Sequence, residues 1–205
     1  MESTSRNDNA ASAGEDSGEP SYAFRRSFSG PRHEFTLRPE AIEWRIGFGA
    51  GHLAYRDVCR VRMSFRTLKL ATDRFVTEIW PISGPKLTLA STSWKSMVEQ
   101  EPLDRPYAAF IVELHRRLAL ARSTASFEAG SPPWLYWPSV AIFLVTLLAI
   151  AALGVQAIRS GEIVGALFVA GFLALFVCRI GTQLRRNHPG TYRADAPPPW
   201  LIPRQ

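Results

Sequence analysis

Four arginine side chains give this 205-residue chain its clearest possibility for chemistry. Arg60, Arg62 and Arg66 alternate with apolar residues along Val58–Arg66, so we expect them on one face of a strand, and Arg56 lies just before it. A guanidinium group matches phosphate and carboxylate oxygens in a bidentate way. These four arginines are therefore predicted to bind anionic lipid head groups or an acidic protein segment. The alternative is a solvated outer face whose basic residues block edge-to-edge pairing.

Two other features resemble sites but favour plainer interpretations. Gly47, Gly49 and Gly51 have the spacing of a phosphate loop, yet the residues that follow alternate like a strand and do not open a helix. We expect a connection between strands there. Cys59 has arginine neighbours that would lower a thiol pKa, but the strand pattern points it inward, which favours an inert core thiol.

The histidines are scattered along the sequence, and the spacing of metal ligands is absent from it. They are His33, His52, His115 and His188. His115 is predicted to be a partly exposed residue of a helix. Because no nucleophile–base pair and no close carboxylate pair stands out, the sequence predicts no enzyme, no metal and no cofactor. It also predicts no nucleic-acid binding, since the basic residues lack interleaved stacking aromatics.

A basic β-rich domain must position the arginines. Residues 21–133 carry 17 lysine and arginine residues against 11 aspartate and glutamate residues, a net charge of +6. Alternating segments from about 22 to 93 predict short antiparallel strands. The spacing of Tyr107, Ile111, Leu114 and Leu118 then predicts an amphipathic helix, with Asp104 as its N-cap. The predicted fold of residues 21–126 is α+β, a small antiparallel barrel or sandwich capped by a C-terminal amphipathic helix.

Two segments carry a family resemblance. Phe35–Trp44 and Leu53–Val61 resemble the bacterial PH-like (pleckstrin-homology-like) domains of small membrane proteins, in which F-x-L-x-P-x-x-L/I precedes Y-x-D-I/V-x-x-V. The resemblance covers roughly residues 28–122. It implies a PH-like barrel in a membrane-tethered binding or assembly module, with no catalytic residues to transfer. In the commonest arrangement the membrane hairpin precedes the domain, whereas here it follows.

Two apolar runs supply the membrane anchor. Ser139–Ile158 and Ile163–Cys178 are separated only by Arg159–Glu162. About 20 apolar residues in a helix cross the hydrocarbon core. We expect transmembrane helices at 134–158 and 162–184 that form a tight hairpin in the lipid bilayer. Basic residues flank its outer ends, which predicts an inner (cell) membrane protein with both termini cytoplasmic.

Small residues recur at helical spacing in the second run, where they allow helices to approach closely. They are Gly161, Gly165, Ala166, Ala170 and Ala174. These residues are predicted to pack the hairpin on itself, or to form a homodimer.

The chain ends differ from the domain in composition. Residues 1–20 are polar and acidic and are predicted to be disordered. Residues 185–205 form a Pro-rich cytoplasmic tail, which either docks on a partner or on the domain, or stays free. Cys59 and Cys178 fall in a strand and a membrane helix, so no disulfide is expected.

These features together predict a membrane-anchored binding or scaffolding protein that presents a basic domain to the cytoplasmic membrane surface. An accessory subunit of a larger membrane complex is the alternative, with a membrane-protein partner packed on the helices. A membrane-bound enzyme is the least favoured interpretation.

Overall fold

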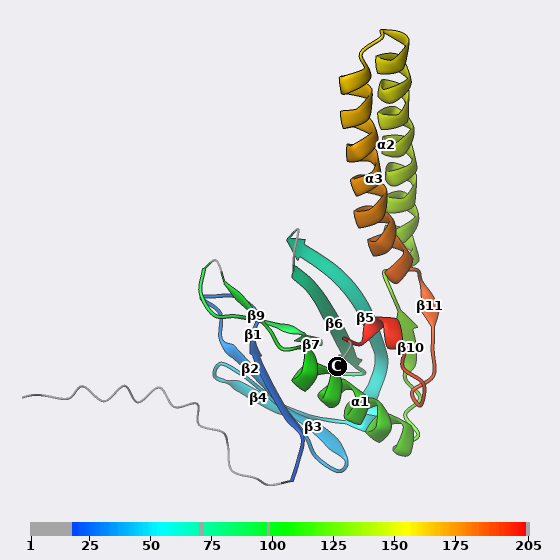
Figure 1. The fold of residues 1–205 in the computed structure, drawn as a ribbon. Coiled ribbons are helices and arrows are strands. Elements are labelled where there is room, and N and C mark those ends of the chain that lie inside the picture. Colours follow the sequence, from blue (N-terminus) through cyan, green and yellow to red (C-terminus); the bar gives the residue numbers. More distant parts are fainter. Residues whose placement is uncertain (1–17, 70–71, 98, 204–205) are drawn as a thin grey trace, which may run out of the picture.

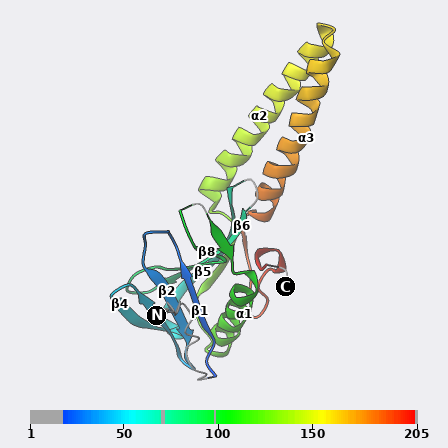
Figure 2. The ribbon, with the colours of Figure 1, turned by 60° about the vertical axis from the view of Figure 1, so that its left-hand side comes forward.

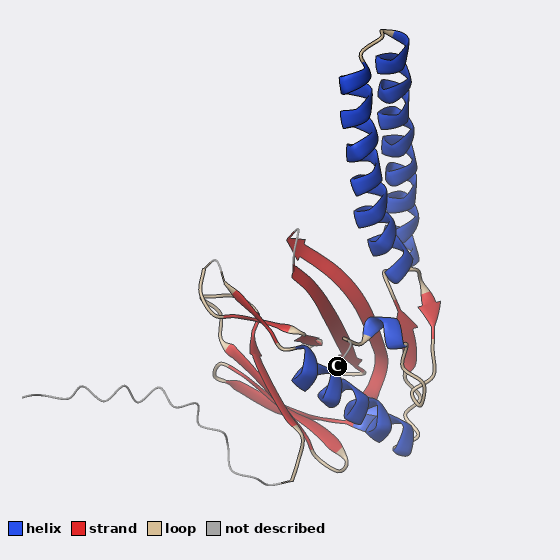
Figure 3. Cartoon of the chain, in the orientation of Figure 1, coloured by secondary structure: helices blue, strands red, loops and turns tan. Residues whose placement is uncertain are grey.

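The computed structural model describes residues 18–69, 72–97 and 99–203. Within them a β-rich domain leads into two long helices, as Figures 1 and 3 show. The α+β class predicted from the sequence is confirmed. The predicted disordered segment 1–20 lies outside the described residues except for residues 18–20.

The first sheet is an antiparallel meander of four strands in the order β1-β2-β3-β4. They are β1 (Ser21–Arg25), β2 (Arg32–Leu37), β3 (Ala41–Ile46) and β4 (Gly49–Ala54). A strand connection lies at the glycine series as predicted, but it is shorter than Gly47–Gly51: Gly47, with φ +60°, and Phe48 form the turn, and Gly49 and Gly51 already belong to β4. Gly51 lies under the Trp44 ring, where an added Cβ would come within 2.7 Å.

The second sheet has five strands in the order β11-β10-β5-β6-β7. They are β5 (Val58–Lys69), β6 (Thr72–Pro81), β7 (Leu87–Ala90), β10 (Ser126–Ala129) and β11 (Gly190–Thr191). The pairs β5–β6 and β6–β7 are antiparallel, whereas β10 runs parallel to β5. A 3-10 turn, η1 (Tyr55–Asp57), links the sheets, and β8 (Thr92–Trp94) pairs with β9 (Gln100–Pro102).

A bulge in β5 overturns the prediction for Cys59. Val61, Met63 and Phe65 are buried as the alternation predicted. The β5–β6 register shifts between Val58 and Arg60, so Val58 turns inward and the Cys59 side chain is exposed. An inserted residue reverses the inside–outside alternation beyond it, so Cys59 is not a core thiol.

Helix α1 (Asp104–Leu120) closes the core between the two sheets. Tyr107, Ile111, Leu114 and Leu118 are fully buried, as their spacing predicted. The N-cap prediction was wrong, because Leu103 occupies that position and Asp104 is already helical. An acidic residue in the first turn still faces the positive end of the helix dipole.

Helices α2 (Pro133–Arg159) and α3 (Ile163–Arg186) lie side by side in both Figure 1 and Figure 2. Phe143 and Phe176 stack between them with ring centroids 5.4 Å apart. Among the described residues these are the helices long and apolar enough to cross a membrane. The length and composition predicted for the two spans are thus confirmed.

The tail packs back on the β-rich domain. Strand β11 pairs with β10, and η2 (Pro199–Leu201) carries Leu201 into the core at 1% exposure. Tyr192 packs against the same core. Of the alternatives left open for the tail, the structure therefore has the described part after α3, residues 187–203, docked on the domain. The domain was predicted to end at residue 126. Its second sheet extends further, because β10 pairs with β5 through Ala129.

Candidate functional site

Three of the four predicted arginines share the outer face of the second sheet. Arg60, Arg62 and Arg66 extend from β5 and are paired in register with β6. Trp80 of β6 lies among cations, with the guanidinium carbons of Arg60 and Arg62 at 5.5 and 5.4 Å from its ring centroid. The Lys86 ammonium lies 5.2 Å from the same ring. Aromatic faces attract cations, so Trp80 gathers the positive groups into one cluster.

Two glutamates pair with these cations. Glu128 of β10 accepts hydrogen bonds from Arg62, the one at Nε being 2.9 Å, and lies 3.5 Å from Arg60 Nε. Arg62 is only 15% exposed, so this pairing holds β10 to β5. Structural ion pairing therefore occupies Arg62.

Arg66 and Lys86 remain the more accessible cations. Both approach Glu78, with Lys86 Nζ 2.7 Å and an Arg66 nitrogen 3.8 Å from Oε1. Their side chains are 57% and 42% exposed, whereas that of Glu78 is 11% exposed. One carboxylate shared by two cations leaves an excess of positive charge at this position.

A pocket of about 670 Å³ joins this cluster to the ends of the long helices. Arg62, Arg66, Trp80 and Lys86 line one side. Apolar residues near the start of α2 and the end of α3 line the other side, namely Leu135, Tyr136, Ile180 and Leu184. We call this cavity the junction pocket. Its lining combines cationic side chains of the sheet with apolar side chains of the helix ends, and this combination suits an amphiphilic anion.

A buried hydroxyl also lines the junction pocket. Ser64 is 6% exposed, and its Oγ has no hydrogen-bond partner among the described residues. Buried polar atoms normally have partners, so an unpartnered hydroxyl in a pocket wall is a candidate ligand contact.

Asn187, the residue after α3, lines the junction pocket. Its Oδ1 accepts from the Phe65 N–H at 2.9 Å, and its Nδ2 donates to the Phe65 carbonyl at 2.6 Å. β10 ends at Ala129, which pairs with Met63 of β5. The two bonds from Asn187 continue the pairing along this edge of β5 to Phe65. Gly130, with φ +77°, passes so close that an added Cβ would lie 2.5 Å from the Asn187 carbonyl oxygen.

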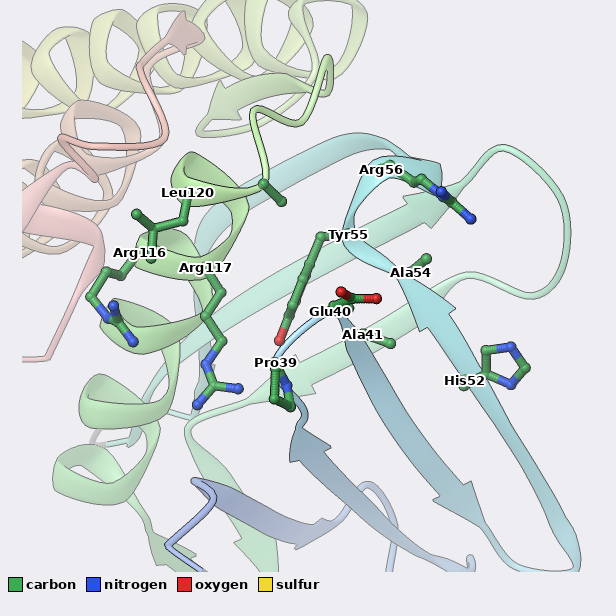
Figure 4. A pocket seen from close by; sticks show the side chains of 11 residues that line it. Pro39, Glu40, Ala41, His52, Ala54, Tyr55, Arg56, Arg116, Arg117 and Leu120 are labelled. Carbon is green, nitrogen blue, oxygen red and sulfur yellow. The ribbon is translucent and has the colours of Figure 1, made fainter.

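The fourth predicted residue, Arg56, lies apart from this cluster. It belongs to η1 and lines a second cavity of about 810 Å³. Figure 4 shows this cavity between α1 and the β2–β3 turn, with Tyr55 between Arg56 and Arg117. We call it the η1 cavity.

Helix α1 supplies the basic side of the η1 cavity. Glu113 binds Arg116 and Arg117 together, at 2.6 and 2.7 Å, and hydrogen bonds from Arg116 hold the pKa of that carboxyl down at about 2. Arg117 also donates to the Leu37 carbonyl at 2.9 Å. The Tyr55 hydroxyl donates to the Arg38 carbonyl at 2.8 Å. These bonds fix the β2–β3 turn to α1.

The structure separates the small residues predicted to pack the helices. Gly161, with φ +75°, lies in the turn between α2 and α3 rather than in a helix. Gly165 and Ala166 are partly buried, whereas Ala170 and Ala174 are exposed. The partly buried stripe continues instead through Val169, Leu173 and Phe176. A homodimer or a membrane-protein partner on the exposed side stays a prediction.

His115 contradicts its predicted exposure. It is 1% exposed on α1, with Nδ1 2.8 Å from the Ile111 carbonyl and Nε2 2.9 Å from the Tyr192 hydroxyl. Tyr192 comes from the tail, which covers this face of α1. Helix periodicity alone does not reveal a distant segment that covers a helix.

Local patterns in the sequence did not predict four members of the arginine cluster, namely Trp80, Lys86, Glu78 and Glu128. Glu78 and Trp80 alternate on β6, but only the β5–β6 register places them opposite Arg62 and Arg60. Within the described residues there is no group of three or more histidine, cysteine, aspartate or glutamate side chains suited to a metal ion. No protein-family model, curated protein or solved structure matches the chain.

Proposed function

We propose that this protein is a membrane-anchored binding module that holds an anionic lipid head group in the junction pocket. The observation that carries the proposal is the position of Arg66 and Lys86, directly beside the ends of two helices long and apolar enough to cross a membrane. Cytoplasmic leaflets are anionic, and each basic residue near their surface contributes about 1 kcal/mol of attraction.

The arrangement of the β-rich domain supports a PH-like fold. A four-stranded antiparallel meander precedes the antiparallel strands β5, β6 and β7, and one amphipathic helix follows the strands and closes the core. This order agrees with the family plan that Phe35–Trp44 suggests. In the proposed topology α2 and α3 form a transmembrane hairpin, and both termini lie with the domain in the cytoplasm.

The chemistry of the pocket walls supports a lipid as the ligand. A phosphate would approach Arg66, Lys86 and the Ser64 hydroxyl, and the glycerol and first acyl carbons would lie against Leu135 and Ile180. Charge-assisted hydrogen bonds to phosphate are the strong ones, and the pocket's apolar wall excludes water from them.

Native mass spectrometry of the full-length protein tests the proposal. The protein, in mild detergent, is offered equal amounts of phosphatidylglycerol and phosphatidylcholine, and the retained lipids are counted. We expect wild type to retain the anionic lipid preferentially by about tenfold, less so as salt rises. The triple variant Arg66→Gln, Lys86→Gln, Glu78→Gln should lose this preference. Glu78 is replaced as well because its carboxylate would otherwise lose both cationic partners.

Arg56→Gln is the matched control, because it lowers the net charge by the same single unit as the triple variant. It lies in the η1 cavity and should retain the preference. Equal retention of both lipids by wild type, or an unchanged preference in the triple variant, would contradict the proposal.

A further inference from the structure

We infer that the outer edge of β4, together with the η1 cavity, binds an acidic extended segment of a partner protein. β4 is the last strand of its sheet, so one of its sides is an open edge. Exposed edges normally carry charged residues or proline, which prevent pairing with other chains. β4 reads Gly-Ala-Gly-His-Leu-Ala and has neither, and Gly49, Ala50 and His52 are exposed.

The backbone of β4 presents bonding groups along this edge. Antiparallel pairs alternate between residues that bond their partner and residues whose groups point away. The Tyr55 N–H bonds the Glu40 carbonyl at 3.1 Å, and Ala54 pairs with Ala41. Alternation from that bonded pair directs the N–H and C=O groups of Ala54, His52 and Ala50 away from β3. An added strand would find donors and acceptors at these three residues.

Charge at the end of β4 selects an acidic segment. Arg56 forms no ion pair among the described residues and is exposed, and it follows β4 directly. Arg116 is 59% exposed on the opposite wall of the cavity. Arg116 and Arg117 share one carboxylate, so even with Glu40 in the lining the cavity keeps an excess of positive charge. Carboxylates of a bound segment would pair with Arg56 and Arg116.

Apolar side chains flank the same track. Leu120, 69% exposed, lines the η1 cavity, and Phe48, fully exposed, marks the turn where β4 begins. Alternate side chains of an added strand face the same side, so a segment with alternating apolar and acidic residues can contact both kinds of group.

The location favours a protein over a lipid. The C-terminal end of α1 lies at the end of the domain remote from α2 and α3 in both Figure 1 and Figure 2. Residues of this end of α1 line the η1 cavity. A domain tethered by those helices would therefore direct the β4 edge away from the bilayer. The two ligand sites would face opposite directions, as a scaffold between membrane and partner requires.

Selection from a phage-displayed library of short random peptides tests the inference on immobilised full-length protein in detergent. We expect the enriched peptides to be rich in aspartate and glutamate alternating with β-branched residues. A representative enriched peptide should bind His52→Pro and Arg56→Glu about tenfold or more weakly than wild type. Proline at His52 removes an outward N–H without removing a bond to β3, so the fold is retained.

Arg105→Glu is the matched control, since it makes the same change in net charge in the first turn of α1. It should bind the peptide like wild type. The inference is overturned if no peptide is enriched, if acidic residues are not enriched, if His52→Pro and Arg56→Glu bind normally, or if Arg105→Glu weakens binding equally.

The lipid proposal can fail independently of this one. Arg56→Glu should leave the preference for phosphatidylglycerol unchanged, and the triple variant of the junction pocket should bind the selected peptide normally. Loss of both activities in either variant would indicate general misfolding, which circular dichroism of each variant detects.

Discussion

A single buried histidine connects α1 to the tail. The Ile111 carbonyl can only accept, so the proton of His115 resides on Nδ1, and Nε2 accepts from the Tyr192 hydroxyl. Burial disfavours the charged imidazolium and lowers the pKa of His115 to about 4. The neutral ring is therefore the form of His115 that this buried contact with the tail favours.

This geometry predicts acid sensitivity. In the unfolded chain the pKa of His115 returns to about 6.5. Between about pH 6.5 and 4 the unfolded state therefore binds a proton that the folded state does not bind. With respect to His115, the free energy of unfolding has its full value above about pH 6.5. It falls by about 3 kcal/mol as the pH drops towards 4. Thermal unfolding of wild type and His115→Gln at several pH values measures this: the stability difference between them should change over that interval, and a constant difference would refute it.

Asn187 provides a second residue-scale prediction. Its amide pairs with both backbone groups of Phe65, and the residue is 5% exposed. Asn187→Leu would leave a buried N–H and C=O without partners, at a cost of about 1–3 kcal/mol each. The melting temperature of the full-length protein should fall clearly. Gln183→Ala, one turn earlier on α3, should have a much smaller effect, and equal effects would argue against the edge-sealing role.

At the scale of elements, the two long helices meet the domain at one strand. β10 leads through Gly130 into α2, and Asn187, the residue after α3, bonds β5. Both helix ends are therefore attached to the strand that carries Arg62 and Arg66. A ligand in the junction pocket contacts helices and sheet together.

Cysteine labelling tests the proposed topology of these elements. Cys59 is exposed on the domain, so its labelling reports the side of the membrane on which the domain lies. In a Cys178→Ala background, a Ser160→Cys substitution places a thiol in the turn between α2 and α3. A membrane-impermeant maleimide added to intact spheroplasts should label the turn thiol. Cys59 should react only after permeabilisation, and the reverse pattern would place the domain outside.

At the scale of the whole molecule, the tail completes the domain. Leu201 is 1% exposed within the core, although some 70 residues and two long helices separate it from β10. The core thus contains residues that precede the two apolar helices in the sequence and residues that follow them. Truncating the chain before the helices would remove β11, Tyr192 and Leu201 from it.

Neighbouring tail residues allow a matched test. Leu201→Ala should lower the free energy of unfolding by about 2–5 kcal/mol, as for other buried leucines. Trp200→Ala, at a residue 56% exposed, should have little effect on the free energy of unfolding. Thermal unfolding and limited proteolysis at the tail would measure both. If the tail did not pack on the domain, Leu201→Ala and Trp200→Ala would have the same free energy of unfolding, and this result would contradict the prediction.

The features that depend on local periodicity could be predicted from the residues alone. Alternation in Val58–Arg66 predicted β5 and the shared face of Arg60, Arg62 and Arg66, and helical spacing predicted the buried stripe of α1. Uncharged runs predicted α2 and α3. Side-chain period follows from backbone geometry, so neighbouring residues are enough to reveal it.

Contacts between distant residues became known only from the folded chain. The bulge that exposes Cys59, the parallel pairing of β10 with β5, and the cover that Tyr192 places over His115 depend on contacts between remote segments. The same is true of Glu128 beside Arg62 and of the separation of Arg56 from the other arginines. Strand register and chain packing are set by the sum of many weak long-range contacts, and no local pattern in the sequence records that sum.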